Sequence, residues 1–526
     1  MGVKTSAPIR RTARLLALAA LLWFAVAGGG RITGSDEVTM FELSRALMHG
    51  RIEVPEGATT RGPDGRTYTK NTAGQAMLAM PFVAAGEAAA SASGLPPGRA
   101  VLASRFFASF FNALVCALLV GALYAFARRL GATAGAAFAA AAMLGFTTPV
   151  WVYAKSFMAE PLEALGLLMA LGNAALASAG GAQRLPDEPR RLRYAALGAF
   201  LAVSAKASML PLALLALAAL GRARPSRWIV PLAGVALAVA GHLAYNAARF
   251  GNPLESGYGA QASAAAFSTP ILVGLYGLLV SSGKGVLWFA PALWLAPSGW
   301  AEMARPRQHS REPKHGGPAR NAAWAAVATW TAALVQFGTF QHWAGDGSWG
   351  PRYLVPLLPL AFLAVAFALT AATRVRRRLA WVLGLAGLVV TLGGVGIHYG
   401  AEMRAVGDYP YTLALDDPHF MEASHFNPRF SPIAVHWRML GENAAMHLRG
   451  DLPALGAGGA VDPRLGISAA DQQALLRAID VWWLYARYAG LPAWPLALAA
   501  LALAAAAVAA SAGALRALRD EGKRAT

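Results

Sequence analysis

The chain has 526 residues, of which 56% are apolar and 14% charged, and its mean hydropathy is +0.43. A soluble domain usually carries about 25% charged residues, so the composition argues against an ordinary soluble protein. The net charge is +19, but the basic residues lie between apolar runs instead of on one domain. This argues against nucleic-acid binding and favours charge that sets membrane topology. The single cysteine, Cys116, provides neither a disulfide framework nor a thiolate metal site.

Apolar runs recur along the chain from Leu15 to Leu515, and those near 107–126 and 494–515 are long enough to span a bilayer. A membrane-spanning helix needs roughly 20 apolar residues, and this pattern predicts an all-α polytopic membrane protein of about twelve spans. We expect three parts: a transmembrane domain over 1–400, an extracytoplasmic segment over 401–491, and a last span with a basic cytoplasmic tail over 492–526.

The basic segments indicate the cytoplasmic side, because Lys and Arg collect in cytoplasmic loops. They are the N-terminus, 128–129, 184–193, 222–227, 305–320, 374–378 and 516–524. The other polar segments then fall outside: 31–103, 151–158, 246–269, 342–352 and 401–491. This alternation requires a hairpin over 194–220 that turns around Lys206. It also requires a single crossing over 270–299 with an irregular break at 281–285. Both chain ends are then predicted to be cytoplasmic.

Residues 1–30 fit two descriptions. A basic region, an apolar region and Ala25-Val26-Ala27 are typical of a cleaved signal peptide. The apolar run is long, and candidate functional residues follow it directly. Both features favour an uncleaved first span.

The first and last outer segments are too long to be simple connections, since unstructured loops beyond about 12–15 residues are uncommon. Within the first outer loop, 31–103, residues 36–49 place Met40, Leu43 and Leu47 on one face before Gly50. This pattern predicts an amphipathic helix along the membrane surface. In the last segment, 469–488 is predicted to be one helix with Trp482, Trp483 and Tyr485 as interface anchors.

Acidic residues follow two predicted spans on the same outer side. Asp36 and Glu37 come directly after the first span, and Glu160 precedes Pro161 at the mouth of the fourth. A carboxylate there serves either as a general base or as a cap for a helix start. Helix N-termini also attract anions. Because these acidic residues lie at helix starts on the same predicted side, the pattern favours a common functional site.

Four basic residues also map to the outer half, which is ordinarily poor in such charge. They are Lys206, Arg249, Lys284 and Arg352. They either bind an anionic ligand such as a lipid phosphate or extend individually to the membrane interface. The histidines show no metal-ligand spacing.

Six short motifs follow one another along residues 12–400. They are Asp36-Glu37, 68–75 with Met80-Pro81, Glu160-Pro161, 245–258, 282–291 and 350–353. In this order they resemble the GT-C superfamily of polyprenyl-phosphate-sugar-dependent glycosyltransferases, which includes protein O-mannosyltransferases and lipid A aminoarabinose transferases. The second acidic position is Glu instead of the frequent Asp, and 401–491 matches no family pattern, so the identity of the substrate does not carry over.

The resemblance implies a GT-C-like helical bundle with a catalytic acid set of Asp36, Glu37 and Glu160, in which Asp36 is the base. Arg352, Lys206, Lys284 and Arg249 are expected to bind the donor phosphate, and Tyr68, Lys70 and Gln75 to belong to a substrate loop. Three roles stay open for Glu160: orienting the acceptor, holding a divalent cation, or pairing with Lys155.

The predicted function is transfer of a sugar from a polyprenyl-phosphate donor to a hydroxyl acceptor (glycan, lipid or protein) on the extracytoplasmic face of a bacterial inner membrane, with inversion at the sugar. No cofactor is assigned, and a divalent cation stays open. The competing hypothesis is a transporter or flippase of lipid-linked sugars, which the interrupted helices would suit. The one-sided charges and the lack of an internal repeat favour the enzyme. A purely structural membrane subunit leaves the clustered charges unexplained.

Overall fold

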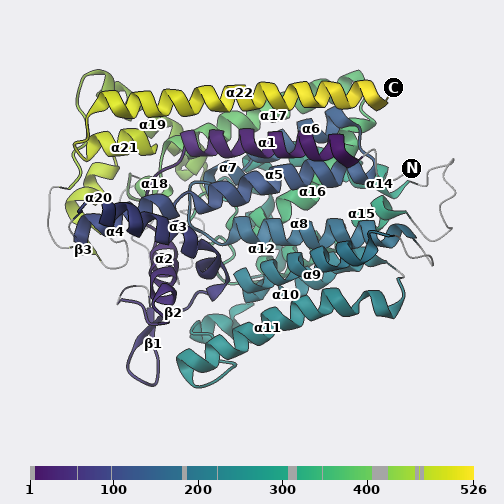
Figure 1. Ribbon diagram of the computed structural model, residues 1–526, viewed down its shortest axis with the longest axis horizontal. Helices are drawn as coiled ribbons and strands as arrows, with labels where there is room; N and C mark the ends of the chain where they lie inside the picture. Colours follow the sequence, from purple (N-terminus) through teal and green to yellow (C-terminus); the bar gives the residue numbers. More distant parts are fainter. Residues whose placement is uncertain are drawn as a thin grey trace.

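The computed structural model describes residues 6–55, 57, 59–95, 97–180, 186–221, 223–305, 317–345, 347–405, 425–456, 461–462 and 467–525. The structure is 76% helical with almost no sheet, which confirms the predicted all-α class. Most of the long helices lie roughly side by side and form an elongated bundle (Figure 1). The bundle helices are α1 (Ser6–Val26), α5 (Phe111–Leu130), α6 (Ala134–Phe146), α8 (Glu160–Ala177), α9 (Glu188–Ala205), α10 (Leu210–Leu217), α11 (Ile229–Phe250), α12 (Ile271–Val280), α14 (Ala296–Ala304), α15 (Pro318–Gly338), α16 (Leu358–Thr370), α17 (Arg374–Gly396) and α22 (Ala493–Ala525).

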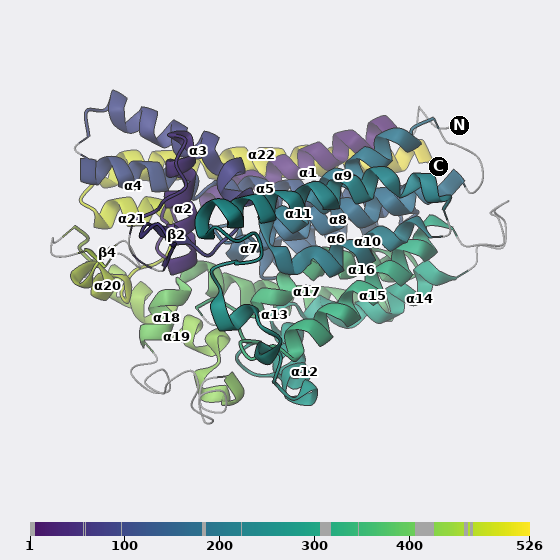
Figure 2. The same ribbon diagram turned by 90° about the horizontal axis from the view of Figure 1, so that it is seen from below.

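The remaining elements gather mostly at one end of the bundle (Figure 1). They are α2 (Ser35–Met48), α3 (Ala73–Ala92), α4 (Pro97–Ala108), α7 (Val150–Tyr153), α13 (Val286–Phe289), α18 (Tyr399–Ala405), α19 (Pro432–Leu448), α20 (Ala469–Leu475) and α21 (Trp482–Tyr488). Two small antiparallel hairpins pair β1 (Thr59–Arg61) with β2 (Thr67–Thr69), and β3 (Val461–Asp462) with β4 (Ile467–Ser468). Figure 2 shows α18 and α19 beside α17, so the last outer segment packs on the bundle.

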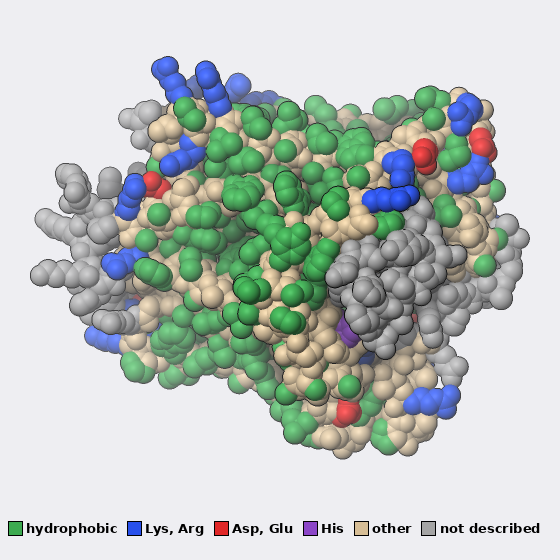
Figure 3. Space-filling model, turned by 180° about the vertical axis from the view of Figure 1, so that it is seen from behind, with side chains coloured by type: hydrophobic (Ala, Val, Ile, Leu, Met, Phe, Trp, Pro, Cys, Tyr) green, Lys and Arg blue, Asp and Glu red, His purple; other side chains and the backbone are tan. Residues whose placement is uncertain are grey.

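Five helical stretches among the described residues are long and apolar enough to cross a membrane. They are Arg99–Leu130, Ile229–Phe250, Arg352–Thr370, Arg374–Gly396 and Ala493–Arg524. Large apolar side chains such as Trp381, Leu272 and Trp494 are exposed. Exposing so much apolar surface to water would be costly, at about 25 cal/mol per Å². A broad apolar face lies between ends that carry Lys and Arg (Figure 3). The protein is therefore a multi-pass membrane protein; the count of about twelve spans stays a prediction.

The polar segments 31–103 and 401–491 share one end of the bundle in their described parts. α1 begins and α22 ends at the opposite end, whereas α2–α4 and α18–α21 lie together (Figure 1). The predicted alternation is thus consistent with the arrangement of the helices. The side of the membrane that each end faces stays a prediction.

Both predicted helix interruptions are confirmed. α9 ends at Ala205, Lys206 has extended backbone (φ −160°, ψ 126°), and α10 begins at Leu210. α12 ends at Val280, and the next helix, α13, begins at Val286.

The predicted single helix over 469–488 is wrong. α20 ends at Leu475 and α21 begins only at Trp482. Between them, the Asp480 N–H donates to the carbonyl of Gly396 at 2.8 Å instead of to its own helix. Tertiary partners thus replace helical hydrogen bonds at this break, because each buried backbone group needs only one good partner.

The predicted interface anchors also have protein partners. The indole N–H groups of Trp482 and Trp483 donate to the carbonyls of Ala25 and Val26, at 3.0 and 3.3 Å. These carbonyls belong to the last turn of α1. Carbonyl groups in the last turn of a helix have no hydrogen-bond partner within that helix. The two tryptophans therefore cap α1.

The amphipathic helix predicted over 36–49 is present as α2, and it runs across the long helices (Figure 1). The chain turns after it at Gly50, whose φ is +67°. Leu43 is buried and packs with Ala73 and Ala76 of α3. The apolar face of α2 therefore contacts protein at Leu43.

Helices α8 and α9 approach each other through glycines. A Cβ on Gly198 would lie 2.4 Å from the Ala170 nitrogen, and one on Gly166 would lie 2.5 Å from the Ala202 nitrogen. Small residues permit such close helix contact in membranes. Because α8 starts at Glu160 and α9 ends beside Lys206, this contact sets the spacing of two candidate site residues.

We expect Gly198→Ala to destabilise the protein by about 1–3 kcal/mol, because the added methyl overpacks the α8–α9 contact. Gly241→Ala is the matched control: Gly241 lies in α11, and a Cβ there meets nothing within 4 Å. The control is expected to be neutral or stabilising, by up to about 1 kcal/mol. The measurement is the thermal unfolding midpoint in detergent, and equal midpoints for the two variants would contradict the prediction.

Candidate active site

Two helix N-termini meet at a single arginine. Arg352 donates from Nε to Glu160 Oε1 at 2.5 Å, and from Nη1 and Nη2 to Asp36 Oδ2 at 3.3 and 3.2 Å. Asp36 lies in the first turn of α2 and Glu160 begins α8. Arg352 opens the short helical segment Arg352–Leu357 that leads into α16. The structure therefore joins three of the predicted site residues in one cluster.

Two lysines flank this cluster. Lys70 Nζ lies 3.9 Å from Asp36 Oδ1, and Lys206 Nζ lies 3.8 Å from Glu160 Oε1. The ammonium groups also lie over aromatic rings, Lys70 over Tyr258 at 5.4 Å and Lys206 over Tyr353 at 4.9 Å. Such rings stabilise a cation. The site thus holds three cations around two carboxylates.

The accessibility of the two carboxylates differs. The side chain of Glu160 is 1% exposed, whereas that of Asp36 is 20% exposed. Lys70 is the most accessible of the three cations, at 34%. Solvent therefore reaches the cluster mainly at Asp36 and Lys70.

The pKa of Asp36 is held below its ordinary value of 3.8. Burial raises this pKa, but the charges of Arg352, Lys70 and Lys206 together outweigh it. Asp36 is therefore ionised and can accept hydrogen bonds or a proton.

Glu37 braces the two acid-bearing helices. Its carboxylate accepts the Gly34 N–H at 3.0 Å and the Phe157 N–H at 2.6 Å, and the side chain is buried. Burial raises its pKa, and these two backbone hydrogen bonds oppose that effect. Glu37 thus caps α2 and ties it to the segment before α8. These contacts are structural, and its predicted catalytic role stays a prediction.

The segment before α8 is held by two further side chains. Gln75 Nε2 donates to the Phe157 carbonyl at 2.6 Å. Asn112 Nδ2 donates to the carbonyls of Ser156 and Met158 at 2.9 and 2.7 Å. Gln75, expected in the substrate loop, is fully buried. It holds the backbone of Phe157, three residues before Glu160.

Tyr68 and Arg249 hold the strand that leads to Lys70. Tyr68 is buried in β2 and donates to Asp64 Oδ2 at 2.6 Å. Arg249 donates to the Thr69 carbonyl, and its guanidinium lies over the ring of Tyr245 at 4.0 Å. Both residues fix the backbone beside Lys70, and phosphate binding by Arg249 stays a prediction.

Lys284 has a comparable place beside Arg352. It is buried, and its Nζ donates to the carbonyl of Ser348 at 2.7 Å, in the segment that precedes Arg352. Phosphate binding by Lys284 likewise stays a prediction.

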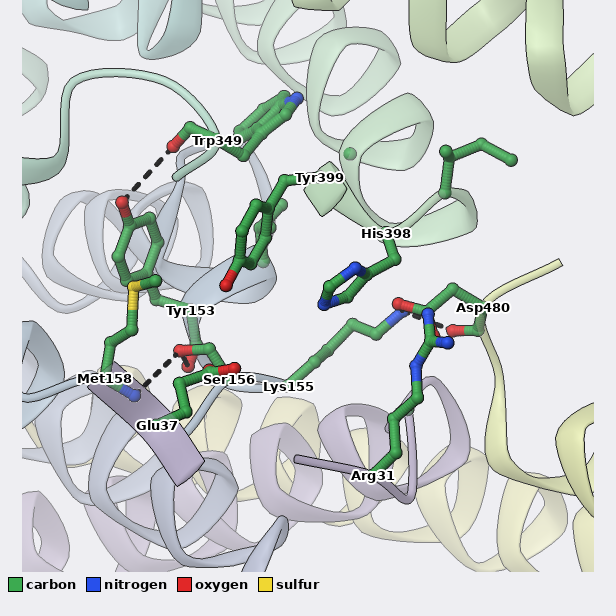
Figure 4. A pocket seen from close by; sticks show the side chains of 14 residues that line it. Arg31, Glu37, Tyr153, Lys155, Ser156, Met158, Trp349, His398, Tyr399 and Asp480 are labelled. Carbon is green, nitrogen blue, oxygen red and sulfur yellow. Dashed lines mark hydrogen bonds and ion pairs between the residues drawn. The ribbon is translucent and has the colours of Figure 1, made fainter. Parts of the chain in front are cut away.

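The pairing considered between Glu160 and Lys155 is wrong. Lys155 instead forms an ion pair with Asp480, Nζ to Oδ2 at 3.1 Å (Figure 4). Asp480 belongs to the break between α20 and α21, which the sequence predicted as helix. Lys155 therefore had a partner that sequence spacing could not indicate.

Glu163 is a candidate site residue that the sequence analysis missed. It lies one turn along α8 from Glu160, is 1% exposed, and its Oε1 has no hydrogen-bond partner among the described residues. The i, i+3 spacing from Glu160 was the available signal. Over the described part of the chain, no group of three or more His, Cys, Asp or Glu is arranged to hold a metal ion.

No protein-family model matches the chain, and no curated protein matches it. Among solved structures, the chain is similar to ArnT from Cupriavidus metallidurans bound to undecaprenyl phosphate. The identity is 18%, the match covers 88% of this chain and 76% of that one, and the TM-score is 0.48. The apo form of ArnT gives 18%, 89%, 76% and 0.46.

A second similar structure is the archaeal oligosaccharyltransferase AglB from Archaeoglobus fulgidus, in complex with an inhibitory peptide and a dolichol-phosphate. The identity is 14%, the match covers 73% of this chain and 55% of that one, and the TM-score is 0.45. Both proteins belong to the GT-C superfamily of polyprenyl-phosphate-dependent glycosyltransferases.

We expect Glu37→Gln to lower the free energy of unfolding by about 1–3 kcal/mol, because an amide offers one acceptor oxygen where two buried N–H groups need partners. The matched control is Glu87→Gln, which alters a half-buried pair with Arg45. Chemical or thermal unfolding in detergent measures the difference. A loss no larger than that of the control would show that the brace is unimportant.

Proposed function

We propose that the protein is a membrane glycosyltransferase that moves a sugar from a polyprenyl-phosphate donor to a hydroxyl acceptor. The observation that carries this proposal is the convergence of Asp36 and Glu160 on Arg352, with Lys70 and Lys206 at their sides. An accessible carboxylate next to several cations provides a base and an anion site together.

The cations suit a phosphate. Arginine offers a planar set of donors that matches phosphate oxygens, and lysine adds a flexible point charge. The N-termini of α2 and α8 add partial positive charge from their unpaired N–H groups. A donor phosphate would compete with Asp36 and Glu160 for Arg352, which here binds both.

The chemistry follows from this competition. The acceptor oxygen attacks the anomeric carbon of the sugar while the bond from that carbon to the phosphate oxygen breaks. The electron pair of this bond leaves with the polyprenyl phosphate, where Arg352 and Lys206 stabilise the charge. The acceptor proton passes to Asp36. A single displacement of this kind inverts the configuration at the sugar.

The position of the cluster fits a lipid-linked donor. It lies where α2 and α8 begin, at the end of the bundle that carries the outer segments. A lipid phosphate would sit at this end while its chain stays in the bilayer. The basic segments belong to the opposite, cytoplasmic end under the positive-inside rule, which supports an extracytoplasmic site in the inner membrane.

We expect Asp36→Asn to lower sugar transfer by about 10²–10⁴-fold, the usual contribution of a general base, without loss of folded protein. The assay uses the lipid-linked sugar that accumulates in a deletion strain, and follows the transferred sugar by glycan and lipid profiling. Asp451→Asn, which alters an exposed pair with Arg477, is the control.

Transfer by Asp36→Asn at near the wild-type rate would reject Asp36 as the base. Movement of the lipid-linked sugar across vesicle membranes without any transfer would instead support a transporter.

We expect Lys70→Met to move the acid limb of the pH profile of kcat/KM to higher pH. Lys70 is one of the cations that lower the pKa of Asp36, and kcat/KM reports the free enzyme. The base is active above the pKa of Asp36 and is lost as the pH falls through it, so a higher pKa ends activity earlier. Arg66→Met, an exposed cation of the same loop, should leave the limb in place. A limb that stays unchanged, or moves to lower pH, in Lys70→Met would contradict the assignment.

A further inference from the structure

A second charged cluster lies buried near the candidate active site. Asp480 pairs with Arg31 through Oδ1 to Nη2 at 2.7 Å, and with Lys155 through Oδ2 to Nζ at 3.1 Å (Figure 4). The three side chains are at most 6% exposed. Burying charged groups is costly unless they are paired. The reaction described above uses none of these residues.

The two cations stand at matching places in the sequence. Arg31 precedes Asp36 by five positions, and Lys155 precedes Glu160 by five positions. The intervening backbone is largely irregular in both cases, and each acid-bearing helix begins directly after it. Without a helical ladder of their own, both segments depend on outside contacts for their position.

Asp480 itself is fixed by its backbone. Its N–H donates to the carbonyl of Gly396 at 2.8 Å, at the end of α17. Its carbonyl accepts from Lys155. Two residues further on, the Trp482 N–H donates to the Gly28 carbonyl at 2.7 Å, just after α1. The backbone that carries this carboxylate is therefore held by hydrogen bonds at the ends of α17 and α1.

The charged cluster borders the same small cavity as Glu37 of the candidate active site. A cavity of about 30 Å³ separates the pair of Asp480 and Lys155 from Glu37, and polar groups of His398 and Tyr399 also line it. A cavity of this size has room for water. The cluster and Glu37, which caps the acid-bearing helix α2, thus border one cavity.

We propose that Asp480 is a positioning residue, which holds the segments before α2 and α8 together so that Asp36 and Glu160 stay at their distance from Arg352. This inference rests on the proposed function for its catalytic consequence. The last outer segment thereby becomes part of the catalytic framework through one carboxylate.

The first test needs no substrate. In Asp480→Asn, hydrogen exchange measured by mass spectrometry should speed up at the amides of 32–37 and 155–160, because two buried cations lose their counter-charge. Asp451→Asn, in the same outer segment, should leave these amides unchanged. Unchanged exchange in Asp480→Asn would overturn the proposal, whether or not the protein transfers sugar.

The second test uses transfer of the lipid-linked sugar from the deletion strain. We expect kcat of Asp480→Asn to fall about 10–100-fold with little change in KM, since a misplacement near 1 Å costs roughly 10²-fold. In the Asp36→Asn background the same change should cause a smaller further loss, because the part of its effect that depends on the position of Asp36 is already removed. An equal further loss in that background would show a general defect of folding and overturn the proposal.

Asp480→Glu keeps the charge and guards against misfolding of the amide variant. It shifts the carboxylate by one methylene, so kcat should fall while the unfolding midpoint stays near that of the wild type. A wild-type kcat in Asp480→Glu, with exchange at both segments unchanged, would also overturn the proposal. If the wild-type protein transfers no sugar at all, the proposed function fails, whereas the exchange result still decides whether Asp480 holds the two segments.

Discussion

The contact between Arg352 and the two carboxylates of Asp36 and Glu160 is the constraint on which the site depends. Two like charges at adjoining helix starts repel each other strongly where water is scarce. One guanidinium can satisfy both, because its donors point in different directions. The starts of α2 and α8 and the approach to α16 must therefore meet at one point, and the surrounding segments are arranged to allow it.

In this contact Arg352 is paired with two carboxylates, and the same guanidinium is the group that we propose binds phosphate. This pairing with both carboxylates compensates the buried charge of Arg352. Lys70 and Lys206 add positive charge at the sides, and Asp36 and Lys70 retain access to solvent. A phosphate that replaces the carboxylates as partner of Arg352 would also release Asp36 to act as a base. Binding of the anion and activation of the base are then coupled through one side chain.

Irregular backbone carries the acids, and buried polar side chains hold that backbone. Glu37 accepts the Phe157 N–H, and Gln75 and Asn112 donate to the carbonyls of residues 156–158. Buried backbone groups of this kind need such partners, because an unpaired one costs free energy. The close α8–α9 contact through Gly166 and Gly198 then fixes Glu160 relative to Lys206. Precision at the site thus comes from several weak supports spread over distant parts of the chain.

Much of this could be predicted from the sequence because the rules involved are local. Apolar runs and basic segments indicated the membrane helices. The backbone breaks at Lys206 and 281–285 and the acids at the helix starts were also predicted, since each depends on a few neighbouring residues. The sequence did not predict which partner each charge would take. Lys155 pairs with Asp480 instead of Glu160, Gln75 supports Phe157, and 469–488 breaks into two helices. Those choices join residues as much as 325 positions apart, and they depend on how whole helices pack. The sequence by itself therefore determined the membrane class and the candidate charges, whereas only the tertiary structure decided their pairing, because a buried charge takes whichever counter-charge the packing brings within reach.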